Sequence, residues 1–327
     1  MDRRKFICLS SGAIAAVGLN ASGRGRQESR ARRNGSPKEM SAAEFHSMRK
    51  FIATDYGRIA YIERGDGPGA IFLHGFPLNS FQWRGIIPQL SALRRCIAAD
   101  FLALGYSEVA DGQSLAPQAQ VSMLEQLLDK LSMSEVDIVA NDSGGAIGQL
   151  FVARHPERVR SLLLTNCDTE PDSPPPAVLP VIELARAGRF ADEWLLPWLN
   201  DKTSARSEKG LGGQCYGNPA HPTDEAIDTY LTPLVSSRER KALTNAYAVA
   251  LALNPLAGIE SALRSCRVAT RIVWGTADKI FSPLSPDYLA RTVGNSLGVR
   301  RVPGAKLFFP EEMPEVIVEE ARFLWEL

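Results

Sequence analysis

The chain has 327 residues, of which 45% are hydrophobic and 23% charged, so it is long enough to bury a large core. Its 37 basic and 37 acidic side chains balance, and this gives no indication of a nucleic-acid partner. The cysteines form no CxxC pair and the four histidines lack metal-ligand spacing, so we expect no metal and no cofactor.

Basic residues concentrate at the N-terminus, where residues 1–50 hold 11 Lys/Arg against 4 Asp/Glu. Arg3 and Arg4 stand before a weakly apolar run ending at Leu19, an arrangement typical of a twin-arginine export signal. This run is shorter than the roughly 20 residues that span a bilayer. We predict an export signal over 1–23, a linker over 24–45, no stable membrane span, and a periplasmic or extracellular location. A disordered basic tail is the alternative.

Short β-branched runs alternate with helical patterns from residue 51 onward. This alternation is typical of a parallel sheet flanked by helices. Two of the strands are joined by the Asp-Tyr-Gly turn at 55–57. We predict strands at 51–54, 58–63, 70–73, 96–99, 136–140 and 159–165, and helices at 117–132 and about 147–154.

The alternation stops near residue 170, where a cluster of prolines marks a boundary. Beyond it, residues 170–262 have helical patterns and no strand pattern. The alternation then returns, with predicted strands at 270–274 and 298–302 and helices at 285–292 and 314–326. We predict an α/β core over 46–169 and 263–327, with a helical cap over 170–262. Such a cap would cover the carboxyl edge of the sheet, where ligands bind in open α/β folds.

One turn has a catalytic pattern. The predicted strand ending at Ala140 runs into residues 141–145 (Asn-Asp-Ser-Gly-Gly) and then a helix, an order typical of a nucleophile elbow. The residues two before and two after the nucleophile must be small, and Ala140 and Gly144 meet this requirement around Asp142. Ser143 is the alternative nucleophile, but it would place the larger asparagine in the tight turn. We therefore predict Asp142 as the nucleophile.

The same turn predicts an anion site. The backbone N–H of Ser143 lies at the start of a helix, where the helix dipole favours negative charge. Its expected partner is the backbone N–H of Phe76, which follows the predicted strand ending in His74-Gly75. Together, the two N–H groups would form an oxyanion hole.

Four motifs, taken together, resemble one superfamily. They are His-Gly-Phe-Pro at 74–77, Asp100 followed by Gly-Tyr-Ser at 105–107, the 141–145 turn, and Arg-His-Pro-Glu-Arg-Val at 154–159. Over residues 50–327 this order resembles the α/β-hydrolase superfamily, and the aspartate in the turn resembles its haloalkane dehalogenase and epoxide hydrolase branch. The resemblance implies a small-molecule substrate that is haloalkane-, epoxide- or ester-like. A carboxylate would attack it, and a His-acid pair would hydrolyse the resulting ester.

The resemblance also implies an acid partner for the nucleophile. Asp278 follows the predicted strand at 270–274 and matches that acid. In some relatives the acid comes after the preceding strand, where Asp168 and Asn166 are weaker candidates. A turn or helix-capping role is the alternative for Asp278.

The chain departs from the family pattern at the catalytic histidine. The resemblance places it near residue 307, but the chain has Leu307 there with Lys306 beside it. Leucine cannot titrate, and a lysine is mostly charged at neutral pH. His74 is the candidate substitute base because its motif lies near the nucleophile, and His221 in the helical segment is a second candidate.

Three hypotheses about function follow. The first is a hydrolase that uses Asp142 with an atypical or incomplete triad, in which the base is His74, His221 or a carboxylate such as Asp278. The second is a non-hydrolytic enzyme, such as a lyase or isomerase, in which Asp142 acts as acid or base. The third is a ligand-binding protein with impaired turnover. The four cysteines beyond the predicted signal are expected to be buried free thiols, and the sequence does not determine the oligomeric state.

Overall fold

The computed structural model describes residues 39–110 and 112–325 of the chain. The predicted export signal and residues 24–38 of the predicted linker lie outside the described residues. The strands of the described part are β1 (Lys50–Thr54), β2 (Gly57–Arg64), β3 (Gly69–Leu73), β4 (Arg95–Ala99), β5 (Glu108–Val109), β6 (Val136–Asp142), β7 (Val159–Cys167), β8 (Ala269–Gly275) and β9 (Ser296–Val302).

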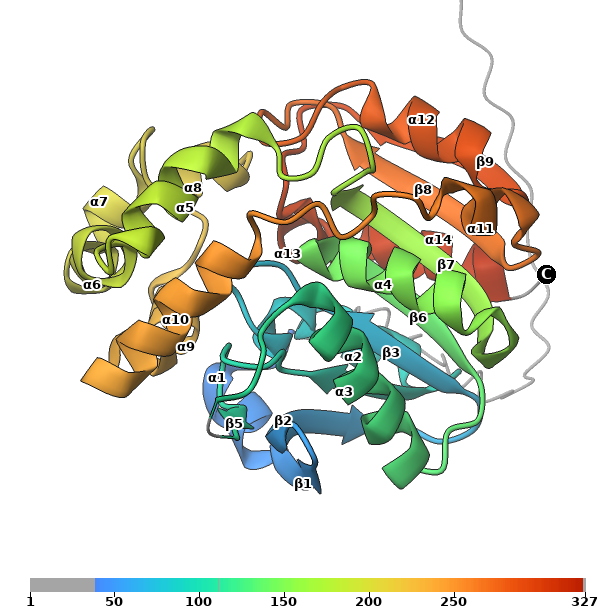
Figure 1. Ribbon diagram of the computed structural model, residues 1–327, viewed down its shortest axis with the longest axis horizontal. Coiled ribbons are helices and arrows are strands. Elements are labelled where there is room, and N and C mark those ends of the chain that lie inside the picture. Colours follow the sequence, from blue (N-terminus) through green and yellow to red (C-terminus); the bar gives the residue numbers. More distant parts are fainter. Residues whose placement is uncertain (1–38, 111, 326–327) are drawn as a thin grey trace, which may run out of the picture. The chain divides into compact units, whose positions relative to one another are not determined.

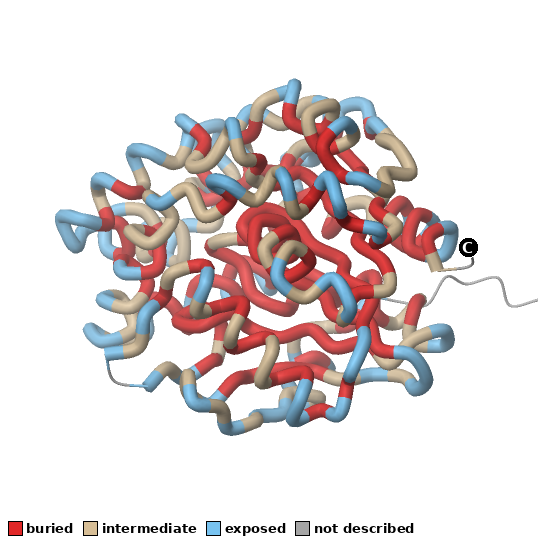
Figure 2. Tube along the Cα trace, turned by 45° about the vertical axis from the view of Figure 1, so that its right-hand side comes forward, coloured by how far each residue is buried: buried red, intermediate tan, exposed pale blue. Residues whose placement is uncertain are grey.

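These strands form one mixed sheet in the order β1-β2-β4-β3-β6-β7-β8-β9, with β5 paired to β2. The pairs that involve β2 are antiparallel, and every pair from β4 to β9 is parallel. All seven residues of β6 are buried, as expected for a central strand covered on both faces. Figure 2 shows the central strands as the most continuously buried part of the described chain. The predicted α/β-hydrolase fold with a mostly parallel sheet is confirmed.

Helices cover both faces of the sheet (Figure 1), with α3 and α4 in front of it and α14 behind it in that view. The α3 helix begins with proline, whose missing N–H is harmless in the first turn. The helices and 3₁₀ turns of this part are α1 (Ala42–Ser47), η1 (Ser80–Trp83), α2 (Ile87–Leu90), α3 (Pro117–Lys130), α4 (Ser143–Arg154), η2 (Pro156–Arg158), α11 (Glu260–Ser265), α12 (Ser285–Thr292), α13 (Phe309–Glu312) and α14 (Pro314–Trp325).

The chain between β7 and β8 is mainly helical. Its two longest helices begin at hydroxyl caps, because Thr223 accepts from the backbone of α9 and Ser237 from that of α10. Helix α11 crosses the boundary that we expected at residue 262. The elements of this segment are η3 (Pro176–Val178), α5 (Leu179–Arg186), the π-helical turn η4 (Ala191–Leu195), α6 (Leu196–Asn200), α7 (Lys202–Arg206), α8 (Leu211–Cys215), α9 (Asp224–Val235) and α10 (Arg238–Ala250).

The predicted linker is wrong in its last residues. Helix α1 begins at Ala42, behind a capping box formed by Ser41 and Glu44. Phe45 is buried and packs edge-on against Phe81, with the ring centroids 5.2 Å apart. Composition alone favoured a linker here, whereas one apolar side chain with a tertiary partner is enough to fix this helix.

Two further features concern the described residues as a whole. Cys96, Cys167, Cys215 and Cys266 are all buried and free, which confirms the prediction for them. No helix in residues 39–110 or 112–325 is both long enough and apolar enough to cross a membrane.

Candidate active site

Asp142 lies on a strained turn between β6 and α4. Its backbone angles are φ 55° and ψ −133°, a region that side chains other than glycine rarely adopt. Close packing explains the glycine two residues later, because a Cβ on Gly144 would lie 2.5 Å from the Leu73 carbonyl oxygen. The turn therefore has the small residues that the sequence pattern required around the carboxylate.

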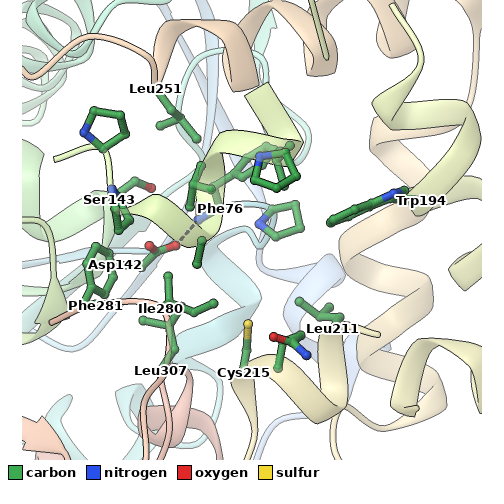
Figure 3. Close-up of a pocket in the computed structure, with 18 of the residues that line it drawn as sticks. Phe76, Asp142, Ser143, Trp194, Leu211, Cys215, Leu251, Ile280, Phe281 and Leu307 are labelled. Carbon is green, nitrogen blue, oxygen red and sulfur yellow. Dashed lines mark hydrogen bonds between the residues drawn. The ribbon is translucent and has the colours of Figure 1, made fainter. Parts of the chain in front are cut away.

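A backbone donor holds the Asp142 carboxylate. The N–H of Phe76 donates to Oδ2 at 2.8 Å, and this bond is drawn in Figure 3. The approach leaves no space for a side chain at Gly75, where a Cβ would lie 2.6 Å from the same oxygen. The structure thus brings together Asp142 and the predicted donor Phe76, with Ser143 next in the chain at the start of α4.

The environment of Asp142 is unfavourable for charge. Burial raises the pKa of its carboxyl well above the ordinary value, and the negative charges of Asp168 and Asp278 raise it further. Hydrogen bonds from the backbone of Phe76 and Ser143 act in the opposite direction, because they stabilise the carboxylate. The ionised side chain is therefore held by backbone dipoles, as in sites that stabilise a developing anion.

Two buried amides position the loop that carries Phe76. Gln82 accepts from the N–H of Gly75 at 3.0 Å, and its Nε2 donates to Asn141 Oδ1 at 2.6 Å. Asn141 Nδ2 in turn donates to Thr165 Oγ1 at 2.8 Å and to the carbonyl of Leu307 at 3.0 Å. Asn141, directly before Asp142, therefore links β6 to β7 and to the loop after β9.

A cavity of about 440 Å³ opens in front of Asp142, within the usual size range of small-molecule sites. Residues of the core and of the helical segment both line it, and most of them are apolar. In Figure 3, Trp194 lies on the opposite side of the cavity from Asp142. The largest apolar side chains of the helical segment and the neighbouring loops are Phe190, Trp194, Trp198, Leu211, Leu251 and Phe281.

The structure overturns the prediction of His74 as a substitute base. Its ring is fully buried and is not among the residues that line the cavity. Nδ1 bonds the carbonyl of Gly75 at 2.9 Å, and Nε2 accepts from the N–H of Phe101 at 3.1 Å. Burial also lowers the pKa of His74. Both nitrogens are engaged with backbone, so His74 shapes the turn and has no free lone pair for a water.

None of the four histidines of the sequence lines this cavity, and Leu307 does. His221 stacks on the ring of Tyr216, with a centroid separation of 6.0 Å. Lys306 also turns away, since its Nζ donates to the carbonyl of Gly213 at 2.6 Å. Within the described residues, no group of three or more His, Cys, Asp or Glu could hold a metal ion.

The two candidate acids differ in where they point. Asp278 does not line the cavity; its carboxylate accepts from Asn166 Nδ2 at 2.8 Å and from the N–H of Ile280 at 2.9 Å. Burial raises its pKa. Asp168 does line the cavity, and Ser173 Oγ donates to its Oδ1 at 2.8 Å. Burial raises the pKa of Asp168 to about 7.

Comparison with known proteins identifies the family. The alpha/beta hydrolase fold family matches residues 71–312, which is most of the chain. This chain belongs to that family. The match begins within β3 and ends at the last residue of α13, so this α/β hydrolase has the Asp142 turn, its helical segment and the loop of Leu307 inside the matched region.

Its relatives include more than one activity. A Shewanella oneidensis protein named cis-3-alkyl-4-alkyloxetan-2-one decarboxylase is 28% identical over 247 residues, 71% of this chain and 74% of that protein. A haloalkane dehalogenase of Sphingobium indicum is 35% identical over 118 residues, 35% of this chain and 40% of that enzyme. The α/β hydrolase thus aligns with less than half of that dehalogenase.

Solved structures agree on the fold. An α/β hydrolase fold protein from Burkholderia ambifaria has 26% sequence identity and a TM-score of 0.70, covering 84% of this chain and 97% of that one. Haloalkane dehalogenase DbeA from Bradyrhizobium elkani USDA94 has 24% identity and a TM-score of 0.70, covering 85% and 97%. At 24% identity, the likeness to DbeA shows a shared fold and nothing further.

Sequence reasoning missed the supporting residues of the α/β hydrolase site. Gln82 and Ser173 carry no motif, and only the folded loops show their hydrogen bonds to Gly75 and Asp168. Asn141 enters the sequence argument only through its size in the turn. Its position directly before Asp142 is the one sequence signal that it lies at the site.

Proposed function

We propose that this α/β hydrolase is a hydrolase that uses Asp142 as a covalent nucleophile on a small, mainly apolar organic substrate. The observation that carries the proposal is the Phe76 N–H bond to one oxygen of a buried carboxylate that lines an apolar cavity. A carboxylate fixed in this way is aimed before the substrate arrives, which lowers the entropic part of the barrier. Haloalkanes, epoxides and esters are the substrate classes that fit this chemistry.

The first step forms an ester. A carboxylate oxygen of Asp142 attacks the electrophilic carbon, and the bond from that carbon to the leaving atom breaks, with its electron pair going to the leaving atom. The apolar walls exclude water from the carboxylate, so its negative charge is poorly solvated and reactive. The helical segment between β7 and β8 acts as a cap that supplies these walls.

The second step hydrolyses the ester. A water attacks the carboxyl carbon of Asp142, and negative charge develops on the oxygen held by the N–H groups of Phe76 and Ser143. The tetrahedral intermediate collapses with release of the alcohol, and the carboxylate is regenerated. Removing a proton from the water needs a base, and Leu307 stands where the resemblance places a histidine.

Intact-mass measurement tests the nucleophile. The purified chain, incubated with 1-bromohexane or 1,2-epoxyhexane, is expected to gain one alkyl or hydroxyalkyl group, which peptide mapping assigns to Asp142. Asp142→Asn should remove the label while keeping the size of the side chain. Asp287→Asn is the matched control, because this exposed aspartate on α12 pairs with Arg301 far from the cavity. Absence of both label and product, or a label that persists in Asp142→Asn, would rule the proposal out.

A second candidate is a lyase reaction that consumes no water. The relative of Shewanella oneidensis that covers most of this chain is named for decarboxylation of an oxetan-2-one, a four-membered lactone. Ring cleavage of such a lactone to an alkene and carbon dioxide balances without a water or its base. Alkene and carbon dioxide from a dialkyl oxetanone, with no hydroxy acid, would favour the lyase over the hydrolase.

We also infer that the protein is exported through the twin-arginine route, on the strength of Arg3, Arg4 and the short apolar run that follows. Conservative replacement of both arginines by lysine keeps the charge but removes the paired-arginine signal. Fractionation of cells that express this double variant should find the chain in the cytoplasm. Continued export of the double variant would contradict the inference.

A further inference from the structure

Building on the hydrolase proposed above, we propose that Asp168 supplies the acid–base chemistry of this site. Its carboxyl donates a proton to an oxygen leaving group when Asp142 attacks, and it accepts a proton from water when the Asp142 ester is hydrolysed. One carboxyl group would then do the work that a histidine does in a complete triad.

Strand pairing places Asp168 next to the nucleophile. Strands β6 and β7 are parallel neighbours, and Asp142 lies opposite Cys167, the residue directly before Asp168. Neighbouring strands are about 4.8 Å apart. Both aspartates line the same cavity, whereas Asp278 does not. Asp168 is also the charged residue with the larger electrostatic effect on Asp142, ahead of Asp278.

The carboxyl of Asp168 is held in place. Ser173 Oγ donates to Oδ1 at 2.8 Å, and Gln149 Nε2 donates to the backbone carbonyl of Asp168 at 2.8 Å. These contacts fix both the main chain and the plane of the carboxyl group. A catalytic acid or base needs such orientation, because proton transfer requires a heavy-atom distance of about 3 Å.

A second, small pocket lies beside the main cavity and suits a single water. Its volume is about 20 Å³, which exceeds the roughly 10–15 Å³ that one water needs. Asp168, Ser143, Ser173 and Tyr247 supply polar groups to its lining. Ser143 Oγ is buried, and within the described residues its side-chain neighbour for hydrogen bonding is the Tyr247 hydroxyl, which leaves it capacity for a water. We expect the Ser143 hydroxyl to hold the hydrolytic water, because Ser143 and Asp168 line both this pocket and the main cavity.

The charges of the two carboxyls order the steps. Two buried carboxyls in one cavity disfavour a double negative charge, and the charge of Asp168 raises the pKa of Asp142. In the proposed mechanism the pair therefore shares one proton, which lies on Asp168 while Asp142 carries the negative charge and attacks. Esterification of Asp142 removes that charge, so Asp168 can ionise and serve as the base. Burial raises the pKa of Asp168 to about 7, so both of its forms are accessible near neutral pH.

The proton balance indicates a class of substrate. Opening an epoxide or lactone places an electron pair on oxygen, and the Asp168 proton neutralises it. Hydrolysis then returns one proton from water to Asp168, and the second proton of the water leaves with the product alcohol. A halide leaves without needing a proton, so dehalogenation would start with a surplus proton on Asp168. The site is therefore matched to ring-opening electrophiles with oxygen leaving groups.

Two reagents separate the two roles of Asp168. With 1-bromohexane, Asp168→Asn should be labelled at about the native rate, since no proton is needed, but the label should decay at least about 100-fold more slowly. With 1,2-epoxyhexane, labelling itself should also slow by at least about 100-fold. Asp168→Glu should recover part of both rates. Glu170→Gln is the matched control, because this nearby acid contacts Gly258 and Tyr288 outside the cavity.

The outcomes are distinguishable. Normal bromohexane labelling in Asp168→Asn shows that the site is folded, so slow decay is then a chemical effect. The decay rate of the native label should rise with pH as Asp168 ionises and then level off, and this dependence should vanish in Asp168→Asn. Decay at the native rate in Asp168→Asn would overturn the role of Asp168 while leaving Asp142 as nucleophile. Neither label nor product from the native chain with either reagent would overturn both.

Discussion

Two clusters of buried carboxyl groups are handled in opposite ways. Glu311 on α13 is paired with Arg84 at 2.8 Å, and it accepts from Tyr216 and Tyr230 at 2.9 and 2.8 Å. Within residues 39–110 and 112–325, the carboxyls of Asp142 and Asp168 have no such cation. Among these residues, Lys209 is the one basic residue that lines their cavity, and it is exposed.

The difference separates a buried acid with a structural role from two buried acids that we propose to be reactive. At Glu311 an arginine and two phenols satisfy the charge and connect the core to the helical segment, since Tyr216 and Tyr230 belong to that segment. At Asp142 only backbone dipoles oppose the effect of burial. A buried acid without a cation has a raised pKa, and such groups concentrate at functional sites.

The largest expected effect is a loss of stability when Glu311 loses the arginine that pairs with it. Arg84→Met removes the cation and leaves Glu311 buried without its partner, which should lower the free energy of unfolding by about 3–5 kcal/mol. Urea unfolding at neutral pH measures it. Arg84→Met combined with Glu311→Met should recover much of the loss. Arg58→Met is the control, because solvent screens its exposed pair with Glu108 and its loss should leave the free energy of unfolding nearly unchanged.

The next effect is a dependence of stability on pH that comes from Asp168, a buried acid without a cation. The pKa of Asp168 is raised to about 7 in the folded chain from an ordinary 3.8, so folding favours its protonated form. Its contribution to stability is therefore full below about pH 4 and is lost as the pH rises through about 7. Relative to Asp168→Asn, the native chain should lose on the order of 2–4 kcal/mol over this range. If the difference in unfolding free energy between the native chain and Asp168→Asn did not vary with pH, the contrast with Glu311, which has a cation, would be contradicted.

A smaller effect is expected when the loop that carries the Phe76 N–H loses its support from Gln82. Gln82→Met removes the partners of the Gly75 N–H and Asn141 Oδ1, which should lower the free energy of unfolding by about 1–3 kcal/mol. Labelling of Asp142 should slow as well, because the Phe76 N–H is no longer held in line. Gln89→Met is the control, since its amide bonds only the Gly85 carbonyl. Unchanged labelling would show that the loop holds its position without Gln82.

The smallest effect is expected at Lys209, and it tests whether this lysine offsets the negative charge of Asp142 and Asp168. Lys209 is exposed at the cavity, and solvent screens its charge. Lys209→Met should therefore change the rate of Asp142 labelling less than about twofold. A tenfold change, measured at low and high salt, would mean that Lys209 compensates the carboxyls and that the two clusters are alike.

Much of this α/β hydrolase could be predicted from local pattern. The strands, the main helices and the small residues around Asp142 each depend on neighbours in sequence, and the structure agrees with them to within a few residues. The predictions that were wrong depend on contacts that form only in the folded chain. Residues 42–45 were placed in a linker although Phe45 has a tertiary partner, and His74 was chosen for its nearness although backbone groups occupy both its nitrogens.

The sequence by itself determined the α/β alternation and the strained turn at Asp142, because periodicity and a tight turn between strand and helix are local requirements. Only the tertiary structure decided which acid faces the cavity. Asp168 and Asp278 both follow sheet strands, but Asn166 and the Ile280 N–H hold Asp278, whereas Ser173 fixes Asp168 at the cavity wall. The contact between Asn166 and Asp278 joins residues 112 apart, and such a contact leaves no pattern in one sequence. The short-range bond from Ser173 to Asp168 depends on a loop conformation that the sequence pattern does not predict either.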